Sequence, residues 1–508
     1  MKKLAYVMLG ILLMASCGKQ SIPTEYSEEN RTARIFPDYK GVVVPPNISP
    51  LNFMVQENAD NYAVRLSEGN NSIEVYTDKY GKADIPEKEW HEMLAKSKGK
   101  DINIEVYAQK EEQWKRYKDF KITVAPDPID DYVSYRLIEP GYEVYRQLGL
   151  YQRKVSSFDV GTIYENNRSF EHENNHCINC HNYQNYSAKN MLFHIRGSHG
   201  GTMVVRNGIP EKMDMSTDST LASAVYPAWH PSKPWVVFSS NKTGQAFHIL
   251  DKQKIEVVDW ASDLLFYDAE HKTIGNVLKT QDDFETFPCW NADGTKLYYC
   301  VAHVSGFKEL SKENRERYVA EHYRDLHYNI MSMTFDKDSK IFGNPQIEVD
   351  CESIGKSASV PRISPDGKYL LFTLGDYGQF HIWHRSADLY VKNLQTGDVY
   401  PLKRANSREA ESYHGWSSNG RWIVFASRRD DGSYTRLYFS YFDKNGKEHK
   451  PFMLPQKDPE QNVLLMKSYN VPEMTKDAVK VPSNKFKDVI YNTKATPVKY
   501  TMLKNEGK

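Results

Sequence analysis

The feature that most constrains this chain is a repeat in its second half. Four segments align without gaps, and each places a large apolar residue before a polar turn and then a run of apolar and aromatic residues. Three of the turns contain Asp-Gly or Asn-Gly, where glycine supplies the positive φ of a tight turn. Such repeats, spaced widely enough for a four-stranded sheet each, predict a radial β-propeller. The segments are residues 229–238, 290–299, 363–372 and 416–425.

The repeat resembles the TolB-type propeller sequence Trp-Ser-Pro-Asp-Gly-Lys, and residues 363–372 match it best. The resemblance implies a fold rather than an activity, because propellers host many functions. Strand-like residues 190–196 and 202–206 predict an earlier blade with an altered turn. Residues 463–466, with part of the C-terminus or of a connector, are expected to close the ring. Five blades can be counted, and we expect six within residues 177–508.

The first residues predict export and lipid anchoring. Lys2 and Lys3 precede an apolar run at residues 4–13, and small residues then lead directly to Cys17. This order is typical of a secretory signal, and the run is shorter than the ~20 residues that span a bilayer. It resembles the lipobox of bacterial lipoproteins, so residues 1–16 are expected to be removed and Cys17 acylated. The alternative is an ordinary signal peptide with an incidental cysteine. We expect attachment to a membrane in a Gram-negative envelope, on the periplasmic side.

Between the signal and the propeller, the pattern predicts three further regions. Residues 17–40 are polar and aperiodic, which indicates a tether. Residues 41–126 contain short alternating strands and one expected helix at 86–98, a pattern typical of an immunoglobulin-like or fibronectin-type-III-like sandwich. Residues 127–176 are irregular and are predicted to be a connector. The expected fold class is therefore all-β, a sandwich followed by a propeller.

Composition excludes some classes of function. Lys plus Arg and Asp plus Glu number 66 each and no basic stripe stands out, which argues against nucleic acid as a partner. Six cysteines in 508 residues do not form the disulfide framework that small secreted proteins need. With Cys17, Cys177 and Cys180 assigned elsewhere, at most one disulfide is left, and we expect the remaining cysteines to pack as small hydrophobes. No Gly-x-Ser-x-Gly sequence occurs, and we assign no catalytic residue.

The strongest chemical motif is Cys177-Ile-Asn-Cys180-His181, the Cys-x-x-Cys-His signature of c-type haem attachment. Two thiols one helical turn apart can form thioethers with one porphyrin edge, and His181 can then bind the iron as proximal ligand. The alternatives are a redox dithiol or disulfide, a zinc site that also uses His176, and a vestigial motif.

The sixth ligand of such a haem would come from nearby. His194 is the first candidate, because it shares a predicted strand face with Arg196, which could pair with a haem propionate. Other candidates are Met191, His199 and Met203.

These observations predict two functions. The first is electron transfer by a membrane-anchored lipoprotein with one covalent haem c and a redox protein as partner. The motif and repeat together resemble TolB-like propeller lipoproteins of Bacteroidota that carry Cys-x-x-Cys-His in an early blade. The second is a non-enzymatic propeller that binds a protein or glycan partner in the cell envelope, for which the Tyr and Trp content is suited.

Overall fold

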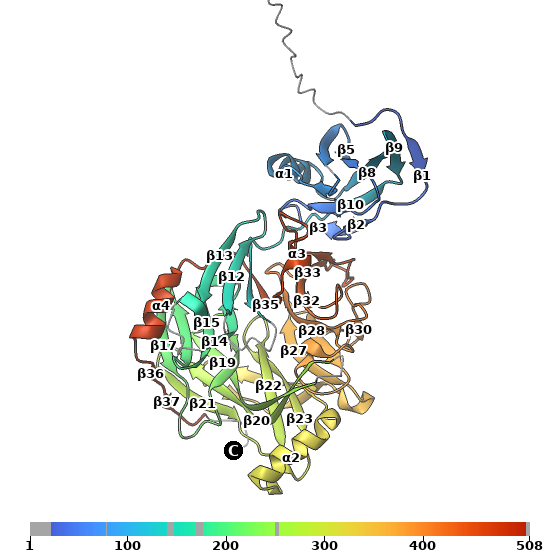
Figure 1. The fold of residues 1–508 in the computed structure, drawn as a ribbon. Coiled ribbons are helices and arrows are strands. Elements are labelled where there is room, and N and C mark those ends of the chain that lie inside the picture. Colours follow the sequence, from blue (N-terminus) through green and yellow to red (C-terminus); the bar gives the residue numbers. More distant parts are fainter. Residues whose placement is uncertain (1–21, 78, 140–146, 169–175, 249–252, 504–508) are drawn as a thin grey trace, which may run out of the picture.

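The computed structural model describes residues 22–77, 79–139, 147–168, 176–248 and 253–503 (Figure 1). The chain is all-β, and its helices are short: α1 (Glu87–Lys96), α2 (Lys312–His322), α3 (Gln461–Leu464) and α4 (Ser483–Asn492). The predicted signal peptide and Cys17 lie outside the described residues. Within the part of the chain that is described, no helix is long and apolar enough to cross a membrane.

The N-terminal region contains a seven-stranded sheet, a three-stranded sheet and α1. Helix α1 is the helix expected at 86–98, and Pro86 precedes its first residue. The predicted tether at 17–40 differs from the structure, because β1 pairs with β9 and β2 pairs with β4. Strands of three and two residues are too short to show a period in the sequence. The strands are β1 (Ser27–Glu29), β2 (Ile35–Phe36), β3 (Val43–Val44), β4 (Phe53–Val55), β5 (Asn61–Glu68), β6 (Asn71–Thr77), β7 (Lys82–Ala83), β8 (Asp101–Lys110), β9 (Gln113–Tyr117) and β10 (Phe120–Val124).

Antiparallel sheets of consecutive strands then follow one another along the chain. Each of the four repeat segments forms the end of a sheet's first strand, the turn and the start of its second strand, as predicted. The turn glycines Gly294, Gly367 and Gly420 have φ of 74°, 71° and 67°. The strands are β14 (His176–Gln184), β15 (Ser187–Gly197), β16 (Gly201–Arg206), β17 (Ile209–Asp214); β18 (Ala224–Trp229), β19 (Trp235–Phe247), β20 (Ile255–Asp268), β21 (Thr273–Leu278); β22 (Asp283–Trp290), β23 (Lys296–His303), β24 (Asn329–Asp336), β25 (Ile341–Phe342), β26 (Gln346–Val349); β27 (Ser357–Ile363), β28 (Tyr369–Gly375), β29 (Asp388–Asn393), β30 (Val399–Pro401); and β31 (Glu411–Trp416), β32 (Trp422–Ser427), β33 (Arg436–Tyr441), β34 (Phe452–Met453).

One further sheet joins two distant parts of the chain. Strand β35 (Ser468–Thr475) pairs with β11 (Tyr132–Ile138), which continues into β12 (Gly149–Lys154) and β13 (Val160–Glu165). Residues 132–138, 149–154 and 160–165 therefore belong to a sheet, where we expected an irregular connector over 127–176. Residues 463–466 were expected to form the closing strand, but 461–464 form helix α3 and the strand begins after them.

Six strands lie in a closed ring, and we call these six the first strands of the ring, although β35 comes last in its own sheet. Strands β14, β18, β22, β27, β31 and β35 contact one another in this order, and β35 also contacts β14. The segment after β35 packs against the last strands of the neighbouring sheets. Helix α4 contacts β13 and β17, β36 (Thr496–Pro497) pairs with β17, and β37 (Lys499–Tyr500) pairs with β21.

The N-terminal sheets share a core with this ring. One hydrophobic cluster includes Trp90 and Phe53 together with Trp422 and Phe439 of β32 and β33. Buried Arg153 of β12 donates hydrogen bonds to Ser49 Oγ of the N-terminal region (3.4 Å) and to the carbonyl of Pro455. Two regions that the sequence pattern separates are therefore joined by continuous packing.

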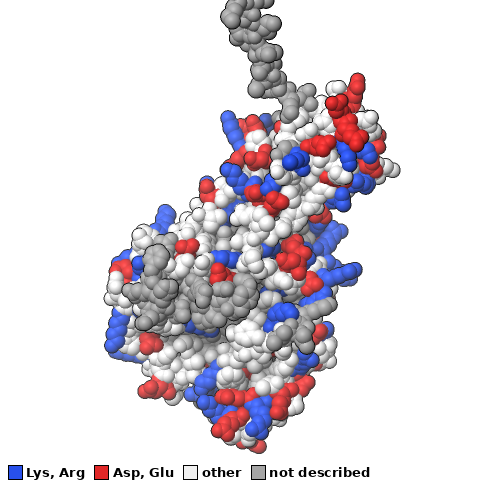
Figure 2. All heavy atoms as spheres, viewed as in Figure 1, with Lys and Arg blue, Asp and Glu red and all other residues white. Residues whose placement is uncertain are grey.

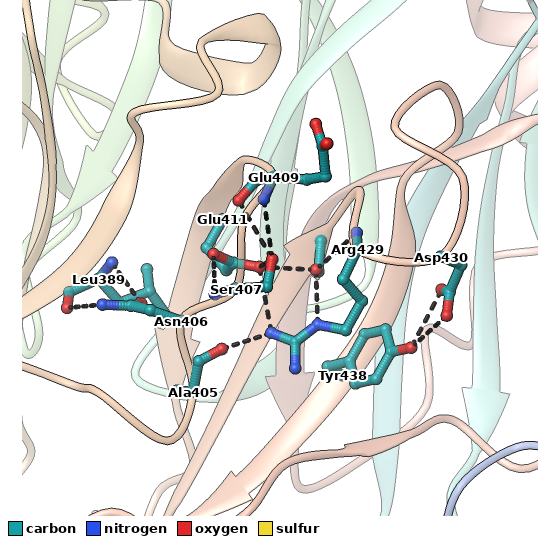
Figure 3. A network of polar contacts seen from close by, with 10 residues as sticks. Leu389, Ala405, Asn406, Ser407, Glu409, Glu411, Arg429, Asp430 and Tyr438 are labelled. Atoms are coloured by element: carbon teal, nitrogen blue, oxygen red, sulfur yellow. Dashed lines mark hydrogen bonds and ion pairs between the residues drawn. The ribbon is translucent and has the colours of Figure 1, made fainter.

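A buried ion pair stabilises the β31–β32 sheet (Figure 3). Glu411, which has no exposed surface, accepts hydrogen bonds from Ser407 (2.7 Å), Ser427 (2.8 Å) and Arg429 (3.1 Å). Burial raises the pKa of Glu411, and these donors oppose the rise. Because its partners come from the preceding loop and from β32 and the residues after it, the network holds the start of β31 in place.

Candidate ligand-binding site

Each first strand of the ring carries the same backbone irregularity. One residue other than glycine adopts a left-handed conformation where the pairing register shifts, which is the signature of a β-bulge. Such φ values are uncommon, above all for a β-branched residue, and they concentrate where the surrounding structure imposes them. The residues and φ values are Cys180 (52°), Tyr226 (45°), Phe287 (50°), Val360 (52°), Tyr413 (39°) and Val471 (46°).

The residue after each bulge is proline or histidine. Proline has no N–H to donate, and it fits here because the bulge leaves the residue out of the ladder. Histidine takes the place of proline in β14 and β31. The residues are His181, Pro227, Pro288, Pro361, His414 and Pro472.

The next residue of each strand lines a central cavity of about 200 Å³. The cavity lies on the side of the ring where first strands turn into second strands, since residues of these turns, such as Asn185 and Pro365, also line it. Three of the six ring positions carry small side chains, and three carry polar ones. They are Asn182, Ala228, Cys289, Arg362, Gly415 and Glu473.

Glu473 is held by the neighbouring strand. The side-chain amide of Asn182 donates to its Oε1 at 2.9 Å, and the Tyr183 N–H also donates to the carboxylate. Burial raises the pKa of Glu473 to about 7, against the lowering effect of Asn182 and of Arg362. The carboxyl group therefore titrates near neutral pH.

Arg362 carries the opposite charge on the same cavity wall. It is half-buried, and it also lines a second, smaller cavity of about 30 Å³ on the ring axis. Its guanidinium donates to the carbonyl of Pro361 at 2.9 Å. No carboxylate oxygen of the described residues lies within 4.0 Å of it. Arg362 and Glu473 are thus close enough to influence each other but do not form an ion pair.

The other end of the ring is covered by the long β19–β20 hairpin. Val258 and Trp260 of this hairpin pack in the same cluster as the bulge residues Phe287, Val360 and Tyr413. Asp259 Oδ2 accepts from Asn241 (2.7 Å) and from Gln379 of the β28–β29 connection (3.2 Å). Burial raises the pKa of Asp259 to about 7. The hairpin thus reaches past the β22 sheet to the β27–β30 sheet.

The Cys-x-x-Cys-His motif lies in strand β14, not on a helix. Cys180 occupies the bulge and His181 the following position, so the motif coincides with the ring's repeated irregularity. Cys177, Cys180 and His181 are 6%, 5% and 3% exposed, and the described cysteines are free thiols. His181 and Cys180 line the smaller cavity, whereas Cys177 is not among its lining residues.

His194 lies apart from His181. It is buried on β15 opposite Asn179, its Nδ1 is 3.3 Å from Thr202 Oγ1, and it lines neither cavity. Burial lowers the pKa of both histidines to about 3, so both are neutral. Both ring nitrogens of His181 lack a hydrogen-bond partner among the described residues. The structure therefore does not bring the predicted proximal and distal ligands to one cavity.

The motif as placed does not fit a haem. The thiols lie on an extended strand, and the cavity beside Cys180 and His181 measures about 30 Å³, whereas pockets that enclose a drug-sized molecule measure about 300–1,000 Å³. No group of three or more His, Cys, Asp or Glu side chains in the described residues is arranged to hold a metal ion, so the zinc alternative has no assembled site either.

The sequence prediction missed Arg362, Glu473 and Asn182. Arg362 directly precedes the third repeat segment, where the other three segments are preceded by Ala228, Cys289 and Gly415. This charged residue among small ones was a signal that could have been read. Glu473 could not be found in the same way, because its strand ends without the repeated turn.

Charges on the visible face are mixed. Figure 2 shows Lys and Arg interspersed with Asp and Glu over both the N-terminal sheets and the ring. This distribution agrees with the balance of 66 basic and 66 acidic residues in the sequence.

No family model and no curated protein matches this chain. Solved structures that match part of it include an oligogalacturonate lyase in complex with manganese, at 11% identity and a TM-score of 0.33, over 64% of this chain and 73% of that one. A prolyl endopeptidase matches at 11% identity and a TM-score of 0.35, over 64% of this chain and 42% of that one. Prolyl oligopeptidase B from Galerina marginata matches at 10% identity and a TM-score of 0.34, over 60% of this chain and 40% of that one. The chain spans less than half the length of these two peptidases, and similarity this low carries no information on activity.

Proposed function

We propose that this protein is a six-bladed β-propeller, joined to an N-terminal β-sandwich, that binds a ligand in its central cavity and performs no catalysis. The six first strands in ring contact support the blade number. Six equivalent bulges, one in each of these strands, support a six-fold repeat of one structural unit.

The observation that carries the binding role is the wall of the central cavity. Arg362 and Glu473 project from equivalent positions of two strands without pairing, while Ala228, Cys289 and Gly415 leave space between them. A half-buried charge without an ion-pair partner costs free energy, and a ligand of complementary charge removes that cost. A structural role alone would be served better by apolar residues at these positions.

The anchor and compartment follow from the sequence. Cys17 is proposed to carry the lipid, with the protein facing the periplasm of a Gram-negative envelope. The ring would then be presented to envelope molecules, either a soluble ligand or the end of a partner chain.

Electron transfer through haem c is the second candidate, and the Cys177-x-x-Cys180-His181 sequence is the observation that favours it. It requires β14 to leave the ring position described above, because the thiols and His181 are buried there. A visible spectrum of protein made with active haem-attachment machinery separates the two candidates.

The binding role is tested by thermal unfolding of the mature protein with a panel of amino acids, short peptides, monosaccharides and nucleotides. A Cβ built at Gly415 meets no atom closer than 3.7 Å, so Gly415→Leu fills the cavity without a backbone clash. Gly161→Leu, at an exposed position of β13, is the matched control. We expect a compound that raises the Tm of the wild type and of the control but not of Gly415→Leu. A panel that leaves the wild-type Tm unchanged contradicts the binding role.

A further inference from the structure

The charged side chains on the cavity wall restrict which chemical groups a ligand of this cavity can carry. Of the described residues that line the cavity, Arg362 is the one Lys or Arg and Glu473 the one Asp or Glu. His414 adds no charge, since burial lowers its pKa to about 3. The cavity wall therefore presents one cationic and one acidic side chain, and a ligand has to form favourable contacts with both.

Arg362 favours a carboxylate. A guanidinium offers five N–H donors in a planar fork that matches a carboxylate with two parallel hydrogen bonds. Of these donors, the hydrogen bond to the Pro361 carbonyl uses one. A phosphate also accepts from arginine, but its second negative charge would lie in a small cavity beside the carboxyl group of Glu473.

Glu473 favours an N–H donor on the same ligand. Asn182 holds Oε1 of Glu473 with its amide nitrogen, and its own oxygen accepts the N–H of Trp229 at 3.0 Å. Asn182 therefore positions Glu473, and Glu473 keeps acceptor capacity for a ligand. The donor can be an ammonium or an amide N–H.

We propose that the central cavity binds a carboxylate with a neighbouring N–H group, the chemistry of an amino acid or of a peptide C-terminus, with Arg362 binding the carboxylate and Glu473 accepting the N–H. This inference rests on the proposed binding function. A cavity of about 200 Å³ suits a ligand of this size better than a drug-sized molecule. The small side chains of Ala228, Cys289 and Gly415 leave the space for it.

The test uses isothermal titration calorimetry of the mature protein with four probes: L-alanine, L-alanyl-L-alanine, the C-terminal amide of that dipeptide, and inorganic phosphate. We expect the dipeptide or the amino acid to bind. Tighter binding of the dipeptide identifies the C-terminus of a peptide as the ligand, and tighter binding of L-alanine identifies a free amino acid. The amide, which lacks the carboxylate, should bind at least about tenfold more weakly.

Variants assign the contact. Arg362→Gln should weaken the binding of the carboxylate probe at least about tenfold, and Arg362→Lys should weaken it less, because lysine keeps the charge but loses the fork. Gly161→Leu should bind as the wild type does. Circular dichroism checks that each variant is folded, and the acid–amide comparison needs no variant at all.

Three outcomes overturn the inference. Measurable binding of the dipeptide and its amide with equal affinity, or tighter binding of phosphate than of any carboxylate probe, excludes the carboxylate class but leaves the binding function intact. No heat from any probe at about 10 mM, well above a Kd of 1 mM, also overturns it. The binding function itself then fails only if the wider thermal panel is negative too.

Discussion

The side chain of Asn182 connects three first strands of the ring: its nitrogen donates to Glu473 Oε1 of β35, and its oxygen accepts from the N–H of Trp229 in β18. Strand β14 is thereby tied to both of its neighbours, at the point where the N-terminal and C-terminal parts of the ring meet. We expect Asn182→Ala to lower the free energy of unfolding by about 2 kcal/mol, because it leaves both partners without their hydrogen bonds. Urea denaturation measures this.

The control for that variant is Asn61→Ala. Asn61 is exposed, and its amide bonds the side chain of Gln109 on the surface, so its loss should change stability by less than about 0.5 kcal/mol. Equal effects of the two substitutions would contradict the role given to Asn182.

The stability contributed by Asp259 and Glu473 should fall as pH rises from about 4 to about 7. The pKa of Asp259 is raised by burial from 3.8 to about 7, and that of Glu473 from 4.5 to about 7. In this range the folded protein keeps protons that the unfolded chain has lost, so raising the pH favours unfolding. Each unit of pKa shift contributes at most about 1.4 kcal/mol.

Asp259→Asn tests the larger of these contributions. Asp259 faces Asn241, Gln379 and Arg196, and the charge of Arg196 lowers its pKa without cancelling the effect of burial. The variant cannot ionise at this position, so the stability of the wild type relative to that of the variant should fall between pH 5 and pH 8. Parallel pH curves for the two proteins, from urea denaturation, would show that Asp259 does not titrate in this range.

His181→Pro should leave the ring folded. Four of the six first strands carry proline directly after the bulge, so the position accepts a residue that has no N–H. We expect a change in the free energy of unfolding of less than about 1.5 kcal/mol. A loss of more than about 3 kcal/mol, the usual cost of proline at a bonded position, would contradict the equivalence of the six strands.

Haem staining of a denaturing gel tests the motif directly, since thioether-linked haem stays with the polypeptide. Because Cys177 and Cys180 are buried in a strand of the ring, we expect no stain in wild-type protein made with active attachment machinery. A stained band that is lost in Cys177→Ser with Cys180→Ser would instead support electron transfer.

A fragment that begins near residue 130 should be much less stable than the whole chain. Trp422 has no exposed surface, and its Nε1 donates to the carbonyl of Asp127. Removal of the N-terminal sheets uncovers Trp422 and Phe439, which share one hydrophobic cluster with them. Thermal unfolding of the fragment and of the chain from residue 22 measures the difference; equal Tm values would show that the two regions are independent.

Period and turn chemistry were sufficient to locate the sheets that carry the repeat. At residues 363–372, for example, Asp366-Gly367 marks the turn, β27 ends at Ile363 before it, and β28 begins at Tyr369 after it. The sequence did not reveal β35 or β11, because their pairing depends on contact between distant residues and neither ends in the repeated turn. Arg362 could have been singled out from the sequence, because it precedes its repeat segment where the other three segments follow Ala228, Cys289 and Gly415. That these four positions line one cavity follows only from the closed ring of strands.

Because β35 closes the ring, the ring can form only after residues 468–475 have been synthesised. Strand β11 is made early and pairs with β12 on one edge, but its partner on the other edge is residues 468–475. A growing chain must therefore hold one sheet edge unpaired until that segment has emerged, and an exposed edge is a site for wrong pairing. A protein that ends before residue 468 would keep that edge of β11 unpaired. It would also lack Glu473, which is the partner of Asn182 and part of the cavity wall. Only a chain that includes β35 can therefore form the closed ring.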